Sequence, residues 1–207
     1  MFRLKVWFVF GLAAVLLGCA PTAKQYIASP KGVLAIAPCF HPNSPWEMLA
    51  GKADLDQNID PKHLRVLDAI LARTLVEDKV EFIPAQVVKP CLLLTPKKPW
   101  QNMLDYWVKV GQCVPADFLL IPYIYVYKQR IGSDYGVTQP AQVEFDLFLL
   151  NVKQKQIDYR FHFKERQVSL SENLLTLGKF LKHKAKWVTA KELFQEGLNQ
   201  GLKEMGL

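Results

Sequence analysis

The sequence of 207 residues contains few of the residues from which metal sites and catalytic centres are built. It has four histidines and four cysteines, and neither type occurs at a spacing typical of metal ligands. The HExxH zinc motif, the G-x-S-x-G nucleophile turn and a glycine-rich phosphate loop are all absent. We therefore expect no metal, no cofactor and no catalytic site.

The sequence also lacks an internal repeat and a strong charge of one sign. Its net charge of +7 falls to +5 (24 basic against 19 acidic residues) without residues 1–18, because Arg3 and Lys5 leave with that segment. Nucleic-acid binding needs a clustered basic face, so this mild excess does not indicate it. Half of the residues are hydrophobic, which excludes wholesale disorder, and the length fits one domain.

The first residues have the pattern of an export signal. Arg3 and Lys5 precede an uncharged run of 12 residues, 6–17, and the small residues Gly18 and Ala20 lie on either side of Cys19. A basic start, an apolar run of about 7–15 residues and a small-residue end are typical of a secretory signal peptide. The run is shorter than the roughly 20 residues that a membrane-spanning helix needs.

The segment Leu16–Cys19 resembles the lipobox of bacterial lipoproteins. In that family the chain is cut before the cysteine, which receives acyl chains. The resemblance implies that residues 1–18 are removed, that Cys19 is lipidated, and that residues 19–31 form a tether for a periplasmic domain over 32–207. Ala20 stands where inner-membrane lipoproteins often have aspartate, so the resemblance favours the outer membrane. An ordinary signal peptide that contains a cysteine is the alternative.

The domain is predicted to begin with a strand and a helix. Residues 32–38 are a short apolar run bounded by glycine and proline, which is typical of a buried strand. Asp60 and Pro61 suit the N-cap and first position of a helix, and leucines and isoleucines follow at spacings of three and four residues. This pattern predicts a helix over 61–77, and a second strand over 80–84.

Prolines interrupt the next segment, so residues 85–99 are predicted to be mostly loop. A helix is predicted over 99–112, because Trp100, Leu104 and Trp107 recur at helical spacing. We interpret the tryptophans of this helix as core residues and not as part of a cofactor site.

From residue 117 the apolar period changes to the alternation typical of strands. Three consecutive strands are predicted, at residues 117–131, 141–152 and 157–169. They are expected to form an antiparallel meander with one buried face. Tyr123, Tyr125 and Tyr127 would share one face of the first strand, and Glu144 and Asp146 would face solvent on the second.

Two helices are predicted at the end of the chain, because the capping-box spacing occurs at Ser169 and again at Thr189. Gly197 and Gly201 lie four residues apart in the last helix, which gives it a face that a sheet or another helix can approach closely. The whole pattern predicts the α+β class: a single domain with a mixed sheet, built from a β-α-β-α unit and the meander, and C-terminal helices.

This order of elements, together with the segment Ala116–Pro122, resembles one group of exported lipoproteins. The group includes the curli-secretion lipoprotein, the lipoprotein activators of penicillin-binding proteins and the N-terminal domain of the Tol translocation protein. The resemblance covers about residues 32–168 and is one of topology.

Three cysteines follow Cys19 in the sequence, and the periplasm is oxidising. Cys91 and Cys113 flank a predicted helix and are the favoured pair for a disulfide, which would leave Cys39 as a free thiol. Three buried and inert thiols are the alternative.

Two surface segments are candidates for interaction. The first is a basic cluster beside aromatic residues, formed by Lys179, Lys182, Lys184, Lys186 and Trp187. Such a mixed patch suits anionic lipid headgroups or lipopolysaccharide phosphates. The second is the loop that begins at Arg130 and contains Tyr135, because loops on a rigid scaffold often bind partners.

Together these patterns predict a lipoprotein held at the membrane through acyl chains on Cys19. We expect it to act as a non-catalytic accessory, scaffold or assembly factor of the cell envelope, with an envelope protein as partner and no nucleic acid. A lipid or lipopolysaccharide carrier would instead need a lined apolar cavity. An envelope hydrolase would need a catalytic cluster in one cleft.

Overall fold

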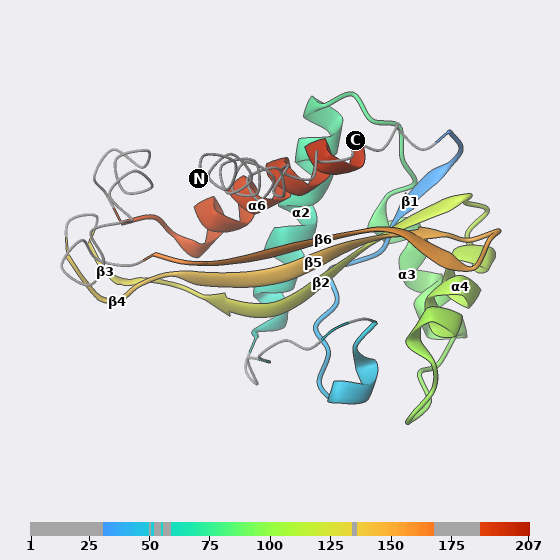
Figure 1. The fold of residues 1–207 in the computed structure, drawn as a ribbon, viewed down its shortest axis with the longest axis horizontal. Helices are drawn as coiled ribbons and strands as arrows, with labels where there is room; N and C mark the ends of the chain where they lie inside the picture. Colours follow the sequence, from blue (N-terminus) through green and yellow to red (C-terminus); the bar gives the residue numbers. More distant parts are fainter. Residues whose placement is uncertain (1–30, 50, 52–54, 56–58, 134–135, 168–186) are drawn as a thin grey trace, which may run out of the picture.

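The computed structural model describes residues 31–49, 51, 55, 59–133, 136–167 and 187–207 (Figure 1). Several of the predicted features lie outside these residues. They are the signal segment 1–18, Cys19, the tether as far as residue 30, Tyr135, the capping box at Ser169, and Lys179, Lys182, Lys184 and Lys186.

The described residues form an α+β fold with a mixed sheet, as the sequence predicts. The strands are β1 (Leu34–Ile36), β2 (Phe118–Lys128), β3 (Ile131–Gly132), β4 (Val137–Gln139), β5 (Gln142–Asn151) and β6 (Gln156–Arg166). The helices are η2 (Pro45–Glu47), α2 (Pro61–Glu77), α3 (Ala85–Leu94), α4 (Met103–Cys113) and α6 (Ala190–Met205). The main sheet has the order β1-β2-β5-β6, in which β1 is parallel to β2 and the other neighbours are antiparallel. β3 and β4 form a separate pair.

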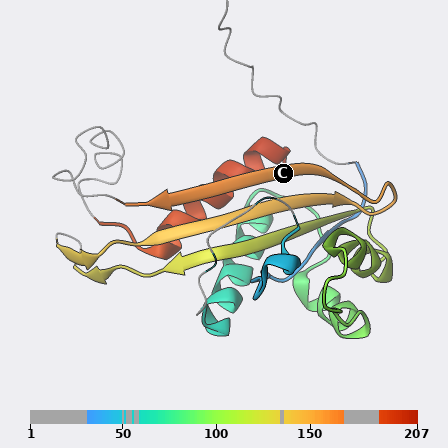
Figure 2. The same cartoon turned by 60° about the horizontal axis from the view of Figure 1, so that its bottom comes forward.

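Two layers enclose the sheet (Figures 1 and 2). Helices α2 and α6 pack on one face, and α3, α4 and the segment 37–49 pack on the other. Both faces of β2 and β5 are therefore buried, and the prediction of one buried face is wrong. The second layer includes a segment far from these strands in the sequence, so alternation within a strand did not reveal it.

Helix α2 forms where the sequence predicts it. The Asp60 side chain accepts a hydrogen bond from the Lys62 backbone N–H at 2.7 Å, and Pro61 occupies the first helical position. The apolar stripe, which includes Leu67 and Leu71, is buried against the sheet. The local cap and the 3.6-residue period act together here.

Helix α3 corrects the prediction of a loop over 85–99. Pro90 lies inside this helix of 10 residues, where it removes one backbone hydrogen bond. Val88 and Cys91 are buried against the second core and hold the helix in place. The strand predicted over 80–84 is also wrong, because only a single bridge, between Ile83 and Ala35, joins this segment to the sheet.

Strand β2 contains a bulge that changes which face its side chains occupy. The register with β5 shifts between Ile124 and Val126. Tyr125 and Val126 both pack in the core with α3 and α4, whereas Tyr127 packs in the core with α2 and α6. The predicted common face of Tyr123, Tyr125 and Tyr127 is therefore wrong for Tyr127, because the extra residue reverses the alternation beyond it.

Helix α6 packs closely on the sheet. Thr189 and Glu192 form the predicted capping box at its start. A Cβ atom at Gly197 would lie 2.6 Å from the ring of Phe163, and one at Gly201 would lie 2.6 Å from the ring of Phe161. The two glycines thus allow the close approach that the sequence predicted.

Candidate interaction surfaces

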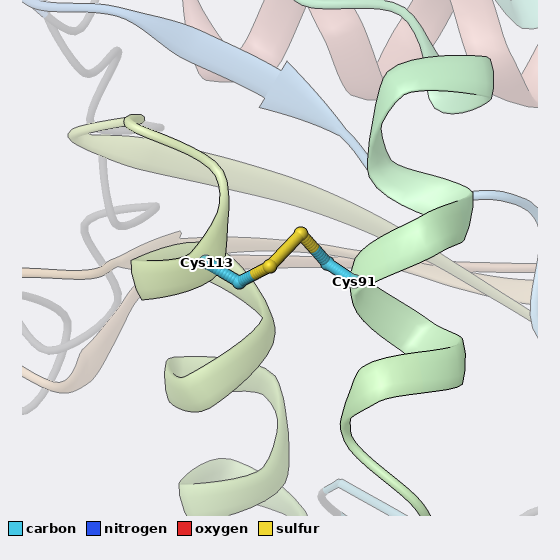
Figure 3. The surroundings of a disulfide bond; sticks show 2 residues. All are labelled: Cys91 and Cys113. Atoms are coloured by element: carbon cyan, nitrogen blue, oxygen red, sulfur yellow. A yellow bond between two sulfur atoms is a disulfide. The ribbon is translucent and has the colours of Figure 1, made fainter.

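A disulfide joins α3 to α4 (Figure 3). It links Cys91 and Cys113, which are 22 residues apart and whose Cα atoms are 5.8 Å apart. This is the pair that the sequence favoured. Cys39 is a buried free thiol whose backbone N–H donates to the Asp68 carboxylate at 2.6 Å. Burial raises the pKa of the Cys39 thiol, and the negative charge of Asp68 raises it further, so the thiol stays protonated.

The end of α3 and the connection to α4 expose large apolar side chains, and this connection forms the lower tip in Figure 1. We call residues 89–100 the α3–α4 tip. Leu93 is 85% exposed, Leu94 is 77% exposed and Trp100 is 83% exposed. The prediction that Trp100 is a core residue in a helix is wrong, whereas Trp107 is fully buried as predicted.

The connection between α3 and α4 is fixed to the rest of the domain by a charged contact. The Lys97 ammonium lies 2.5 Å from the Glu47 carboxylate and 4.6 Å from the ring centroid of Phe40. Glu47 is buried and also accepts a hydrogen bond from the Asn43 backbone N–H. A buried carboxylate with a lysine partner is a strong restraint, because losing either charge leaves the other unpaired.

Trp100 occupies a turn in an unusual backbone conformation. The Gln101 N–H donates to the Lys98 carbonyl at 3.3 Å, which places Pro99 second and Trp100 third in the turn. Trp100 has a φ of +60°. Turns with proline second and a positive φ third usually carry glycine there, because a Cβ atom strains this conformation.

A polar cluster lies within the second face of the sheet. Asp146, predicted to face solvent, is fully buried and accepts a hydrogen bond from the Tyr125 hydroxyl at 2.7 Å. The Arg160 guanidinium lies 2.8 Å from one carboxylate oxygen of Asp146, and His162 Nδ1 lies 2.7 Å from the other. Burial raises the pKa of the Tyr125 hydroxyl, and the Asp146 charge raises it further.

A second buried carboxylate on the same face is also paired. Glu144, likewise predicted to face solvent, is buried, and its carboxylate lies 2.9 Å from the Lys164 ammonium. Arg160, His162 and Lys164 alternate along β6 and lie beside the two carboxylates of β5. This arrangement holds two neighbouring strands together.

The two surface segments singled out from the sequence meet at one point. The Arg130 guanidinium donates to the backbone carbonyl of Trp187. Trp187 is half-buried and precedes α6, while Arg130 follows β2. The contact joins one end of the sheet to the start of the last helix.

In the part of the chain that the structure describes, no helix has the length and apolar character required to cross a bilayer. No three or more potential metal ligands gather in that part either.

Comparisons with known proteins find similarity of structure alone. No protein-family model matches, and no curated protein is significantly similar in sequence. The PelC dodecamer from Paraburkholderia phytofirmans is similar, with 10% identity, a TM-score of 0.48, and coverage of 89% of this chain and 94% of that chain. Lipoprotein GNA1162 from Neisseria meningitidis has 18% identity, a TM-score of 0.42, and coverage of 77% and 98%. The LpoB C-terminal domain from Salmonella enterica has 9% identity, a TM-score of 0.41, and coverage of 68% and 86%.

Proposed function

We propose that the chain is a membrane-anchored lipoprotein that acts as a non-catalytic accessory or assembly factor of the bacterial cell envelope. Acyl chains on Cys19 attach it to the outer membrane, and residues 32–207 form a domain that faces the periplasm. Confining the domain to a membrane surface raises its effective concentration for an envelope partner.

The Cys91–Cys113 disulfide is the observation that carries this proposal. Disulfides persist in oxidising compartments such as the periplasm and are rare in the cytosol. The chain that contains this disulfide starts with a signal-like run that ends in a lipobox-like segment. An export signal and a structural disulfide support the same compartment independently.

The side chains of the second sheet face favour a structural role for the charged groups. The buried carboxylates Asp146 and Glu144 are paired with basic side chains of β6. These pairs account for both carboxylates as contacts between β5 and β6. The domain thus offers surfaces for recruitment.

Detecting acylation of Cys19 tests the proposed anchor. The chain is expressed in cells that are supplied with a labelled fatty acid, and the mass of the N-terminal peptide of the mature protein is measured by mass spectrometry. We expect label on the native chain and on Cys39→Ala, and none on Cys19→Ser. The native chain should also fractionate with the outer membrane. An unlabelled native chain that remains in the soluble fraction would overturn the proposal.

A further inference from the structure

We propose that the α3–α4 tip is a second membrane contact, which inserts Leu93, Leu94 and Trp100 among the headgroups of an anionic bilayer. This inference rests on the proposed function for the location of the chain beside a membrane. It adds a contact made by the folded domain itself, independent of the acyl chains.

The exposed side chains of the tip contribute little to folding. Leu93, Leu94 and Trp100 are each more than three-quarters exposed, so they bury little area against the domain. Trp100 also holds a positive φ at a turn position that glycine fills at lower cost. A bulky apolar side chain that strains its own turn and buries little of its surface indicates a ligand outside the domain.

The charges around these side chains favour an anionic bilayer over a neutral or cationic surface. From residue 85 to residue 104 the chain contains three lysines and no acidic residue. Lys97 is engaged with Glu47, which leaves Lys89 and Lys98 exposed beside the apolar side chains. Tryptophan and leucine flanked by lysine is the composition of segments that lie in the membrane interface, where the lysines pair with lipid phosphates.

Three interactions hold the α3–α4 tip in position before it meets the membrane. The disulfide joins α3 to α4, and the Lys97–Glu47 pair fixes the connection between them. The Asn102 side chain accepts a hydrogen bond from the Leu104 backbone N–H and caps the start of α4. Because the segment is ordered before binding, little conformational freedom remains to be lost at the membrane.

The proposed tether joins the domain at the end of the molecule that carries the tip. Cys19 and Lys31 are 12 residues apart, so the tether spans at most about 40 Å. Figure 1 and Figure 2 place β1, which begins shortly after Lys31, and the α3–α4 pair at the same end of the long axis of the molecule. The β3–β4 pair lies at the opposite end.

Site-specific photocrosslinking tests the proposal. The full chain is reconstituted into vesicles of phosphatidylglycerol and phosphatidylethanolamine, with a benzophenone amino acid in place of Trp100. The matched control carries it in place of Ile131, which is 57% exposed on β3 at the opposite end. We expect a phospholipid adduct from position 100 and only background from position 131.

Charge variants of the crosslinking chain test the role of the lysines. Lys89→Glu with Lys98→Glu should lower the lipid-adduct yield at position 100 by about tenfold or more. Lys128→Glu with Lys191→Glu makes the same change in net charge at exposed positions on β2 and α6 and should leave the yield unchanged.

Three outcomes would overturn the proposal: equal lipid yields at positions 100 and 131, an adduct at position 100 to a second copy of the chain or to another protein, or no adduct. A chain that fails to attach to the vesicles at all contradicts the anchor. A chain that attaches but gives no lipid adduct at position 100 contradicts the tip alone.

Discussion

At the residue scale, one of the two tryptophans at α4 is a core residue and the other is exposed to solvent. Trp107 is fully buried, and its indole N–H donates to the Tyr123 hydroxyl at 2.7 Å. Trp100 lies in the turn before α4 and is 83% exposed. Their sequence spacing fits one helical stripe, so periodicity alone assigned both to the core. The distinguishing signal was Pro99 directly before Trp100, which favours a turn.

Trp100→Gly should leave the domain as stable as the native chain, or more stable by up to about 1.5 kcal/mol. Removing the Cβ atom relieves the left-handed backbone by about 1–2 kcal/mol, while the greater freedom of glycine when unfolded costs about 0.5–1 kcal/mol. Urea unfolding measures the difference, and Trp107→Ala serves as the control, with an expected loss of about 3–5 kcal/mol. A loss above about 1 kcal/mol for Trp100→Gly would show that Trp100 supports the fold.

The Tyr125–Asp146 pair predicts a loss of stability at alkaline pH. The folded chain keeps the Tyr125 proton because its pKa is raised, whereas the unfolded chain releases it near pH 10. The free energy of unfolding therefore falls above about pH 10, by about 1.4 kcal/mol per pH unit for this one group. Urea unfolding between about pH 9 and pH 11 should give a smaller slope for Tyr125→Phe. Identical slopes for the two chains would refute the assignment.

At the element scale, the sequence predicted those elements that local rules determine. Helix α2 has both a cap and a stripe, and apolar residues alternate along β6 and the first half of β5, so the positions of these elements were predictable. Helix α3 was missed because Pro90 and neighbouring prolines outweighed its short apolar face. The burial of Asp146 was missed because its partners, Tyr125 and Arg160, lie on the neighbouring strands β2 and β6.

The candidate site was predictable only in part. The cysteine pair followed from the helix that the two residues flank. The α3–α4 tip did not follow, since exposure depends on which face of α3 meets the sheet. The sequence does contain a pattern that could have predicted an exposed tip, because Leu93 and Leu94 are followed within six residues by two prolines, two lysines and Trp100.

Removing the disulfide should loosen the α3–α4 pair. Cys91→Ala with Cys113→Ala is expected to lower the free energy of unfolding by about 3 kcal/mol, because the closed loop restricts the unfolded chain. Urea unfolding with and without dithiothreitol measures this. The native chain should fall to the level of the double variant when reduced, and the double variant should not respond. An unchanged midpoint for the reduced native chain would argue against the disulfide.

Gly201→Ala tests the close packing of α6 on the sheet. The new methyl group would lie 2.6 Å from the Phe161 ring and 2.8 Å from a Leu147 methyl carbon. Overpacking costs about 1–3 kcal/mol and the gain in helix propensity is about 1 kcal/mol, so we expect a net loss of up to about 2 kcal/mol in thermal or urea unfolding. Gln200→Ala, on the exposed side of α6, is the control. A more stable Gly201→Ala chain would contradict the packing.

At the scale of the whole molecule, the features form a consistent arrangement. The central strands β2 and β5 are buried on both faces, the disulfide joins one pair of helices at one end, and that pair displays an apolar and basic tip. The β3–β4 pair lies at the opposite end (Figure 1). A membrane contact at one end would leave the other surfaces free for an envelope partner.

The central claim is membrane-localised recruitment, and affinity capture after crosslinking in intact membranes tests it most directly. The native chain is compared with Cys19→Ser, with Cys39→Ala as the matched cysteine control. We expect specific envelope proteins to be recovered with the native and Cys39→Ala chains and lost with Cys19→Ser. Equal fractionation and equal recovery for the native chain and Cys19→Ser would contradict it.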